Sequence, residues 1–168
     1  TKFSPNHVKP QHLLNACPIY KESPLKSLQS IADLNIFIKD ESHRMNLGSF
    51  KALGGVYAVA CLLADRWFEF TGTKLTLEQY TSIEFRKFSS LTTFICASAG
   101  NHGLAVASGA KIFGAKAKIH LSLGVPKEFE NRLIKQLAVV VRSGKTYEES
   151  VDAAIEDANT THGVLLAD

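Results

Sequence analysis

The amino-acid sequence predicts an α/β fold, in which helices cover both faces of a parallel sheet. From residue 93 onward, short runs rich in Val, Ile and Leu alternate with longer amphipathic segments, a pattern typical of consecutive βαβ units. The composition, 45% hydrophobic over 168 residues, is sufficient for one buried core. We therefore expect right-handed crossovers and a ligand crevice at the carboxyl ends of the strands.

The expected elements follow in chain order. Residues 35–39 alternate apolar and polar side chains, as a strand does. Residues 49–70 are predicted to form a long apolar helix, and residues 74–90 a more polar helix at the surface. Pro126 suits the first turn of a later helix, where a missing N–H costs no hydrogen bond. In the regular part of the chain we expect strands at 93–97, 117–121, 139–142 and 164–167, and helices at 104–113, 126–136 and 146–160.

The chain is expected to divide at residue 34. Residues 1–34 are predicted to form an N-terminal arm, extended over about the first 30 residues, because this segment is polar and carries four of the five prolines. Residues 35–168 are predicted to form a partial α/β domain. The chain stops at Asp168 directly after an apolar strand, an unusual place for a native terminus. We therefore expect this chain to be a fragment of a longer protein whose C-terminal part is absent.

Composition argues against several classes of protein. The 19 basic and 16 acidic residues are spread along the chain without a basic run, so no nucleic-acid partner is expected. No apolar stretch reaches the roughly 18 residues of a transmembrane helix, so no membrane partner is expected. Cys17, Cys61 and Cys96 are far apart and are predicted to be buried thiols of a cytoplasmic protein. The six histidines have no metal-ligand spacing, so no metal site is expected.

Lys51 is a candidate catalytic residue because it lies at a predicted loop-to-helix junction. The segment Leu-Gly-Ser-Phe precedes it, and an apolar helical run follows it. A lysine that is desolvated in such a position loses its proton near neutral pH and can attack a carbonyl group. Taken alone, a lysine near a helix start is more often a solvated surface charge.

A second candidate is segment 98–103, which reads Ser-Ala-Gly-Asn-His-Gly between a predicted strand and a predicted helix. Backbone N–H groups at such a helix start can bind a carboxylate or a phosphate. Alternatively, the segment is a tight turn in which Asn101 caps the helix and His102 bonds locally. A Rossmann dinucleotide site is disfavoured, because no G-x-G-x-x-G follows a predicted strand.

Four segments match a known family in order and spacing. They read Tyr-Lys-Glu-Ser-Pro-Leu at 20–25, Lys-Asp-Glu-Ser at 39–42, Phe-Lys-Ala-Leu-Gly-Gly-Val-Tyr-Ala at 50–58 and Gly-Asn-His-Gly at 100–103. From residue 18 onward the chain resembles the pyridoxal-phosphate enzymes of fold type II, the tryptophan-synthase-β type. Within this group it is most similar to the diaminopropionate ammonia-lyases. Threonine and serine deaminases more often carry Arg-Gly where this chain has Leu-Gly-Gly.

The resemblance implies elimination of ammonia from 2,3-diaminopropionate to give pyruvate, with pyridoxal phosphate as cofactor. It implies that Lys51 and Asp168 are catalytic and that Lys51 holds the cofactor as a Schiff base. Phe50 would pack near the cofactor ring, and Asn101 would hydrogen-bond the ring hydroxyl. The residues implied to bind the substrate carboxylate are Ser98, Ala99, Gly100 and His102. A homodimer is also implied.

Two departures from the family pattern refine this expectation. Lyases that act on both enantiomers carry an aspartate, one of two bases, where this chain has Ala99, so the L-isomer is expected to be preferred. The other base matches Asp168; a carboxyl group in a closed, apolar site binds a proton more readily than in water and so works near pH 7. Asp168 as a helix cap or loop charge is the alternative.

The parts of the family's site that bind the cofactor phosphate and the pyridine nitrogen are expected outside this chain. Gly54-Gly55 is not the phosphate loop, because it lies inside the helix after Lys51 and there permits close packing. Two alternatives to the lyase stay open. One is a threonine or serine deaminase of the same fold. The other is a non-catalytic relative that binds an amino acid, because such a protein would not need a carboxylate at the position of Ala99.

Overall fold

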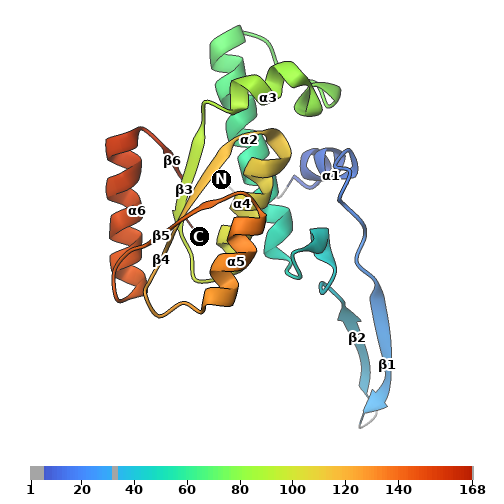
Figure 1. The fold of residues 1–168 in the computed structure, drawn as a ribbon. Helices are drawn as coiled ribbons and strands as arrows, with labels where there is room; N and C mark the ends of the chain where they lie inside the picture. The colour runs from blue at the N-terminus through green and yellow to red at the C-terminus, as the bar shows by residue number, and fades with distance from the viewer. Residues whose placement is uncertain (1–5, 32–33, 168) are drawn as a thin grey trace, which may run out of the picture.

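A parallel sheet of four strands lies at the centre of the structure, a computed structural model that describes residues 6–31 and 34–167 (Figure 1). The strands lie in the order β5-β4-β3-β6, and every neighbouring pair is parallel. Their bounds are Thr93–Ala97 for β3, Lys116–Leu121 for β4, Val139–Arg142 for β5 and Val164–Leu165 for β6. The prediction of a parallel sheet is confirmed, and β6 ends two residues earlier than expected.

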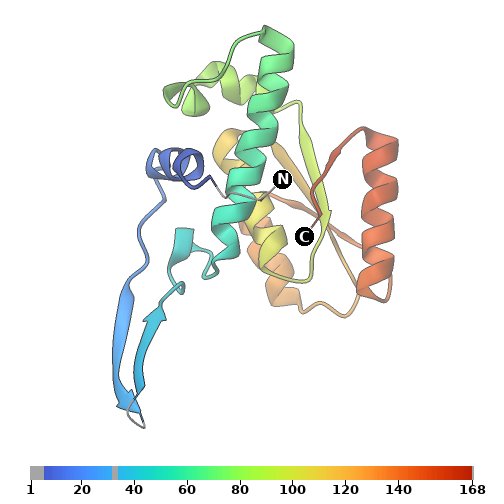
Figure 2. The same cartoon turned by 180° about the vertical axis from the view of Figure 1, so that it is seen from behind.

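Helices cover both faces of this sheet, as the sequence predicts. Helices α4 (Asn101–Phe113) and α5 (Lys127–Lys135) lie on one face, and α6 (Tyr147–Thr161) lies on the other (Figures 1 and 2). Helix α2 (Lys51–Thr71) packs on the outer side of α4. Within the described ranges, no helix combines the length and the apolar character needed to cross a membrane.

Two glycines allow α2 and α4 to cross closely. A Cβ atom added to Gly55 would lie 2.4 Å from Ala105 Cβ, and one added to Gly109 would lie 3.0 Å from Val59 Cβ. A Cβ on the neighbouring Gly54 would meet nothing within 4 Å. The expectation of close packing in this helix is therefore confirmed for Gly55. The crossing fixes the position of Lys51, at the start of α2, relative to the start of α4.

The N-terminal segment is not extended throughout, which corrects the expectation for the first 30 residues. It contains α1 (Val8–Asn15) and the strand β1 (Leu25–Ile31). Pro10 does not prevent the helix, because it lies in the first turn, where an N–H has no partner within the helix. Leu13 packs against the hydrophobic core and so holds α1 on the body of the protein.

Strand β1 pairs with β2 (Leu34–Lys39) in an antiparallel hairpin, and this pairing joins residues on the two sides of the expected boundary at residue 34. The division into an arm and a domain stays a prediction. In both views the hairpin extends away from the sheet and its helices (Figures 1 and 2). Leu34 and Phe37 are 65% and 62% exposed there.

The segment 74–90 forms two short helices where one was expected. The 3-10 helix η2 (Glu78–Thr81) is followed by α3 (Ile83–Ser89). Ser82 separates them, because it has an extended backbone (ψ 152°) and its hydroxyl oxygen accepts the N–H of Phe85. It is therefore the N-cap of a new helix. Phe85 of this helix packs against Trp67 of α2, with ring centroids 5.7 Å apart.

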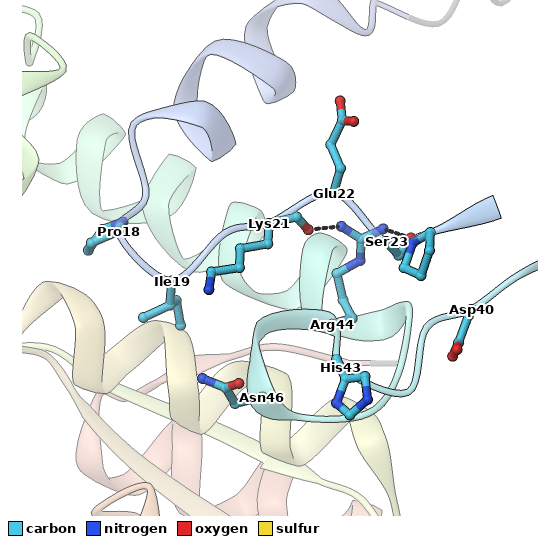
Figure 3. Close-up of a pocket in the computed structure, with 10 residues that line it drawn as sticks. Pro18, Ile19, Lys21, Glu22, Ser23, Asp40, His43, Arg44 and Asn46 are labelled. Carbon is cyan, nitrogen blue, oxygen red and sulfur yellow. Dashed lines mark hydrogen bonds between the residues drawn. The ribbon is translucent and has the colours of Figure 1, made fainter.

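Arg44, in the 3-10 helix η1 (Arg44–Asn46), ties the base of the hairpin to the segment before β1. Its guanidinium is 5% exposed and donates to both carboxylate oxygens of Glu41, at 2.6 and 2.8 Å, and to the carbonyl oxygen of Lys21. Figure 3 shows this group beside a pocket of about 370 Å³. Because these donors already bind acceptors of the protein, we interpret Arg44 as a residue that stabilises the fold and not as a ligand-binding residue of this pocket.

The Glu41 carboxylate gives a pH-dependent contribution to stability. Hydrogen bonds from Arg44 and Ser23 lower the pKa of Glu41 from 4.5 to about 2. Because the folded-state pKa lies below the unfolded one, this contribution is complete above pH 4.5 and is lost as the pH falls toward 2. We expect Glu41→Gln to lower the free energy of unfolding by about 1–2 kcal/mol at neutral pH and by much less near pH 2. Denaturant titrations across this range test it, and a pH-independent difference would contradict it.

Candidate functional site

A pocket of about 340 Å³ opens between the start of α2 and the start of α4, beyond the carboxyl end of β3. This is the edge at which ligands bind in parallel α/β sheets. The size falls within the range of small-molecule sites. The lining residues are Lys51, Ser98, Ala99, Gly100, Asn101, His102 and Tyr147. The structure thus brings Lys51 together with the 98–102 loop, although about fifty residues separate them in the sequence.

Lys51 is the first residue of α2 and is half-buried. The chain turns into the helix at Gly48, whose φ of +74° is in the left-handed region. The buried hydroxyl of Ser49 accepts the backbone N–H of Lys51 at 3.2 Å. Lys51 therefore belongs to a pocket wall and is not a fully solvated surface charge, which was the alternative for this residue.

The Ser98 hydroxyl shapes the loop from within. Ser98 is 4% exposed, and its Oγ accepts the N–H groups of Gly103, at 2.9 Å, and Gly100, at 3.2 Å, and donates to the carbonyl oxygen of Gly100. A Cβ on Gly103 would lie 3.0 Å from Ser98 Cβ, so a small residue is required there. These contacts hold the backbone of the loop in place, and the binding of the substrate carboxylate by Ser98 stays a prediction.

Asn101 and His102 have different environments. The N-cap position belongs to Gly100, and Asn101 is the first helical residue with an exposed side chain, so Asn101 is not the helix cap. His102 is 8% exposed, and its Nε2 is hydrogen-bonded to the carbonyl oxygen of Leu166 at 3.0 Å. His102 thus links the start of α4 to the chain after β6, a contact 64 residues away and not a local one.

Two predicted site residues are not placed in the pocket. Phe50 is 68% exposed and is not among the residues that line it. Its position near a cofactor ring stays a prediction. Asp168, the expected base, lies outside the described residues. In the described part of the chain, no three His, Cys, Asp or Glu side chains are grouped so that they could hold a metal ion. No disulfide joins the three cysteines; Cys96 is buried, and Cys17 and Cys61 are half-buried.

Tyr147 lines the pocket and was missed by sequence reasoning. It is the first residue of α6 and follows Thr146, whose hydroxyl oxygen accepts the N–H of Glu149 as an N-cap. The only sequence signal was its position after a strand end, at the edge of the sheet where ligands bind. A tyrosine in a polar segment does not by itself indicate a site.

The loop before Tyr147 is held by a polar network centred on the buried His120. His120, on β4 and 4% exposed, is hydrogen-bonded to Ser143 Oγ through Nδ1 and to Asp157 Oδ2 through Nε2, both at 2.9 Å. Lys118 Nζ donates to Asp157 Oδ1 at 2.9 Å. Burial works against ionisation of Asp157, but the bonds from Lys118 and His120 outweigh it and lower the pKa of this carboxyl group. The charged Asp157 therefore anchors β4, α6 and the loop after β5 to one another.

Comparisons with known proteins identify the family of this chain. Residues 17–168 match the model of a family described as pyridoxal-phosphate dependent enzyme. Diaminopropionate ammonia-lyase of Escherichia coli K12 is 32% identical over 148 residues, which are 86% of this chain and 36% of that protein. A probable D-serine dehydratase of Rhizobium etli is 36% identical over 132 residues, 76% of this chain and 29% of that protein.

Solved structures give the same result. The crystal structure of E. coli diaminopropionate ammonia lyase in complex with an aminoacrylate-PLP azomethine reaction intermediate superposes with a TM-score of 0.81 at 26% identity. The match covers 99% of this chain and 43% of that one, so the chain spans less than half of the proteins it resembles. The matched family model covers most of the chain, and the chain belongs to the family of pyridoxal-phosphate-dependent enzymes.

Proposed function

We propose that the complete protein eliminates ammonia from L-2,3-diaminopropionate and releases pyruvate. The observation that carries this proposal is the pocket in which Lys51 faces the same space as the 98–102 loop. The similarity to diaminopropionate ammonia-lyases supports the choice of substrate. We also propose that the enzyme is a cytoplasmic homodimer, as the family resemblance implies.

The residues present fit pyridoxal phosphate. The half-buried Lys51 supplies an amine for covalent attachment to the cofactor aldehyde, and the exposed amide of Asn101 supplies a partner for a ring hydroxyl. Phe50 precedes Lys51 and is proposed to contact the ring. When bound, the cofactor supplies an electron sink for negative charge at the substrate α-carbon.

The protein residues would orient the substrate and move its protons. Ser98 Oγ already accepts the N–H groups of Gly100 and Gly103, so the attraction of the substrate carboxylate is assigned to the positive end of the α4 dipole at Asn101. That contact would direct the α-carbon toward Lys51. The methyl group of Ala99 cannot accept a proton, so we assign removal of the α-proton to Asp168, which leaves one base and a preference for the L-isomer.

A dehydratase is the second candidate, because two probable D-serine dehydratases are also similar to this chain, at 34% and 36% identity. It would remove hydroxide from serine in the same kind of pocket. The other candidate functions are threonine deamination on this fold and amino-acid binding without catalysis.

Turnover of defined amino acids by the complete protein with added cofactor distinguishes these functions. We expect the highest kcat/KM for L-2,3-diaminopropionate, with two ammonia molecules released per pyruvate because both nitrogens leave. Serine would release one ammonia per pyruvate, and threonine would give 2-oxobutyrate. Faster turnover of either serine isomer or of L-threonine would contradict the proposal. A protein that stays colourless with cofactor would support the binding module instead.

A further inference from the structure

Tyr147 forms a wall of the pocket that neither Lys51 nor the 98–102 loop provides. It comes from α6, on the opposite face of the sheet from α4. Among the described residues that line the pocket, none carries a carboxylate. The phenol of Tyr147 is therefore the side-chain group of this wall that can form a hydrogen bond with a ligand.

The contacts of the preceding loop hold Tyr147 in this position. Ser143 is bonded to the buried His120, and Gly144 has a φ of +75°, which a residue with a side chain rarely adopts. The backbone N–H of Lys145 donates to the Glu149 carboxylate, and the Thr146 hydroxyl caps α6. Each of the four residues before Tyr147 is thus constrained, so the loop fixes where the backbone of Tyr147 meets the pocket.

The three walls match the three polar ends of a β-substituted amino acid. If the proposed function holds, the carboxylate lies at the start of α4 and the α-amine lies near Lys51. The remaining wall, Tyr147, is left for the group on the β-carbon. A phenol oxygen accepts a hydrogen bond from an ammonium group, and the face of a tyrosine ring attracts a cation.

We propose that Tyr147 contacts the β-substituent of the substrate and favours a β-ammonium group over a β-hydroxyl group. This inference rests on the proposed function and specifies which residue selects the leaving group. Ser98 and His102 differ from Tyr147 in this respect, because their side chains form hydrogen bonds with the protein's own backbone.

The test compares Tyr147→Phe and Tyr147→Leu in the complete protein with bound cofactor. The ratio of kcat/KM for L-2,3-diaminopropionate to that for L-serine is expected to fall about 3- to 10-fold in Tyr147→Phe, which loses one hydrogen bond. It is expected to fall about 10- to 100-fold in Tyr147→Leu, which also loses the cation–π contact. Titration of the cofactor's visible absorption with each amino acid gives the corresponding dissociation constants, which are expected to shift in the same direction.

Tyr80→Phe is the matched control, because Tyr80 lines a different pocket and its loss of a hydroxyl should leave the ratio unchanged. Equal losses for both substrates in the Tyr147 variants would overturn the inference while leaving the proposed function intact. A wild-type protein that turns over neither substrate would overturn both. If Tyr147→Leu does not fold, Tyr147→Phe alone decides, since it keeps the ring.

Discussion

Replacing Lys51 by alanine is expected to abolish the visible absorption of the lysine-bound cofactor and to lower kcat/KM by about a thousand-fold or more. The amine is the one group in the described pocket wall that can form a covalent bond with the cofactor aldehyde. Lys51→Arg keeps the positive charge but forms no such bond at neutral pH, so it should lose the absorption as well. Spectra of the complete protein with added cofactor, together with pyruvate release, measure both effects.

Lys111→Ala is the control for this prediction, because Lys111 lies exposed near the end of α4 and donates to the carbonyl oxygen of Lys135. It should keep both colour and activity. The melting temperatures of all three variants should stay close to that of the wild type, since Lys51 is only half-buried. A coloured, active Lys51→Ala protein would exclude Lys51 as the attachment site.

Most of the sheet could be predicted from the sequence, because its strands are short apolar runs with helical segments between them. The pattern predicts β3 and β5 with both ends correct and β4 to within one residue. Lys51 and the 98–102 loop became candidates through the order and spacing of several segments, because a lysine at a helix start is by itself more often a surface charge; the structure brings both to one pocket. Predictions failed where one residue changes a local rule. Pro10 sits in a helical first turn, and Ser82 starts a new helix inside an amphipathic segment.

The position of Tyr147 in the pocket could not be predicted, because contacts across the fold determine it. The His120 to Ser143 bond spans 23 residues and the His120 to Asp157 bond spans 37. The periodicity of apolar residues predicts which face of a helix or strand is buried. It does not predict which loop a buried histidine will bind. The contacts of Ser98 had the same limit. The resemblance implies that Ser98 binds the substrate carboxylate, which stays a prediction, and the structure shows in addition that its hydroxyl bonds the loop's own backbone.

The separation between Lys51 and the 98–102 loop depends on how closely α2 approaches α4, so the crossing at Gly55 controls the site as well as the core. Gly55→Leu is expected to lower the free energy of unfolding by about 3 kcal/mol. Even the first carbon of the new side chain would lie 2.4 Å from Ala105 Cβ and 3.2 Å from the Ala105 backbone. The helices must then move apart at the turn after Lys51. A displacement of about 1 Å is sufficient to cost roughly a hundred-fold in turnover. Denaturant titration and steady-state kinetics of the complete protein measure the two losses.

Gly54→Leu provides the matched control, since it makes the same substitution one residue earlier in the same helix. A Cβ there meets nothing within 4 Å, and the position is exposed. Leucine is the better helix former by somewhat less than about 1 kcal/mol, so this variant should be as stable as the wild type or slightly more stable, with unchanged turnover. Equal destabilisation by the two substitutions would mean that the close crossing at Gly55 does not set the distance between Lys51 and the loop. Loss of stability in Gly55→Leu without loss of turnover would restrict the role of the crossing to the core.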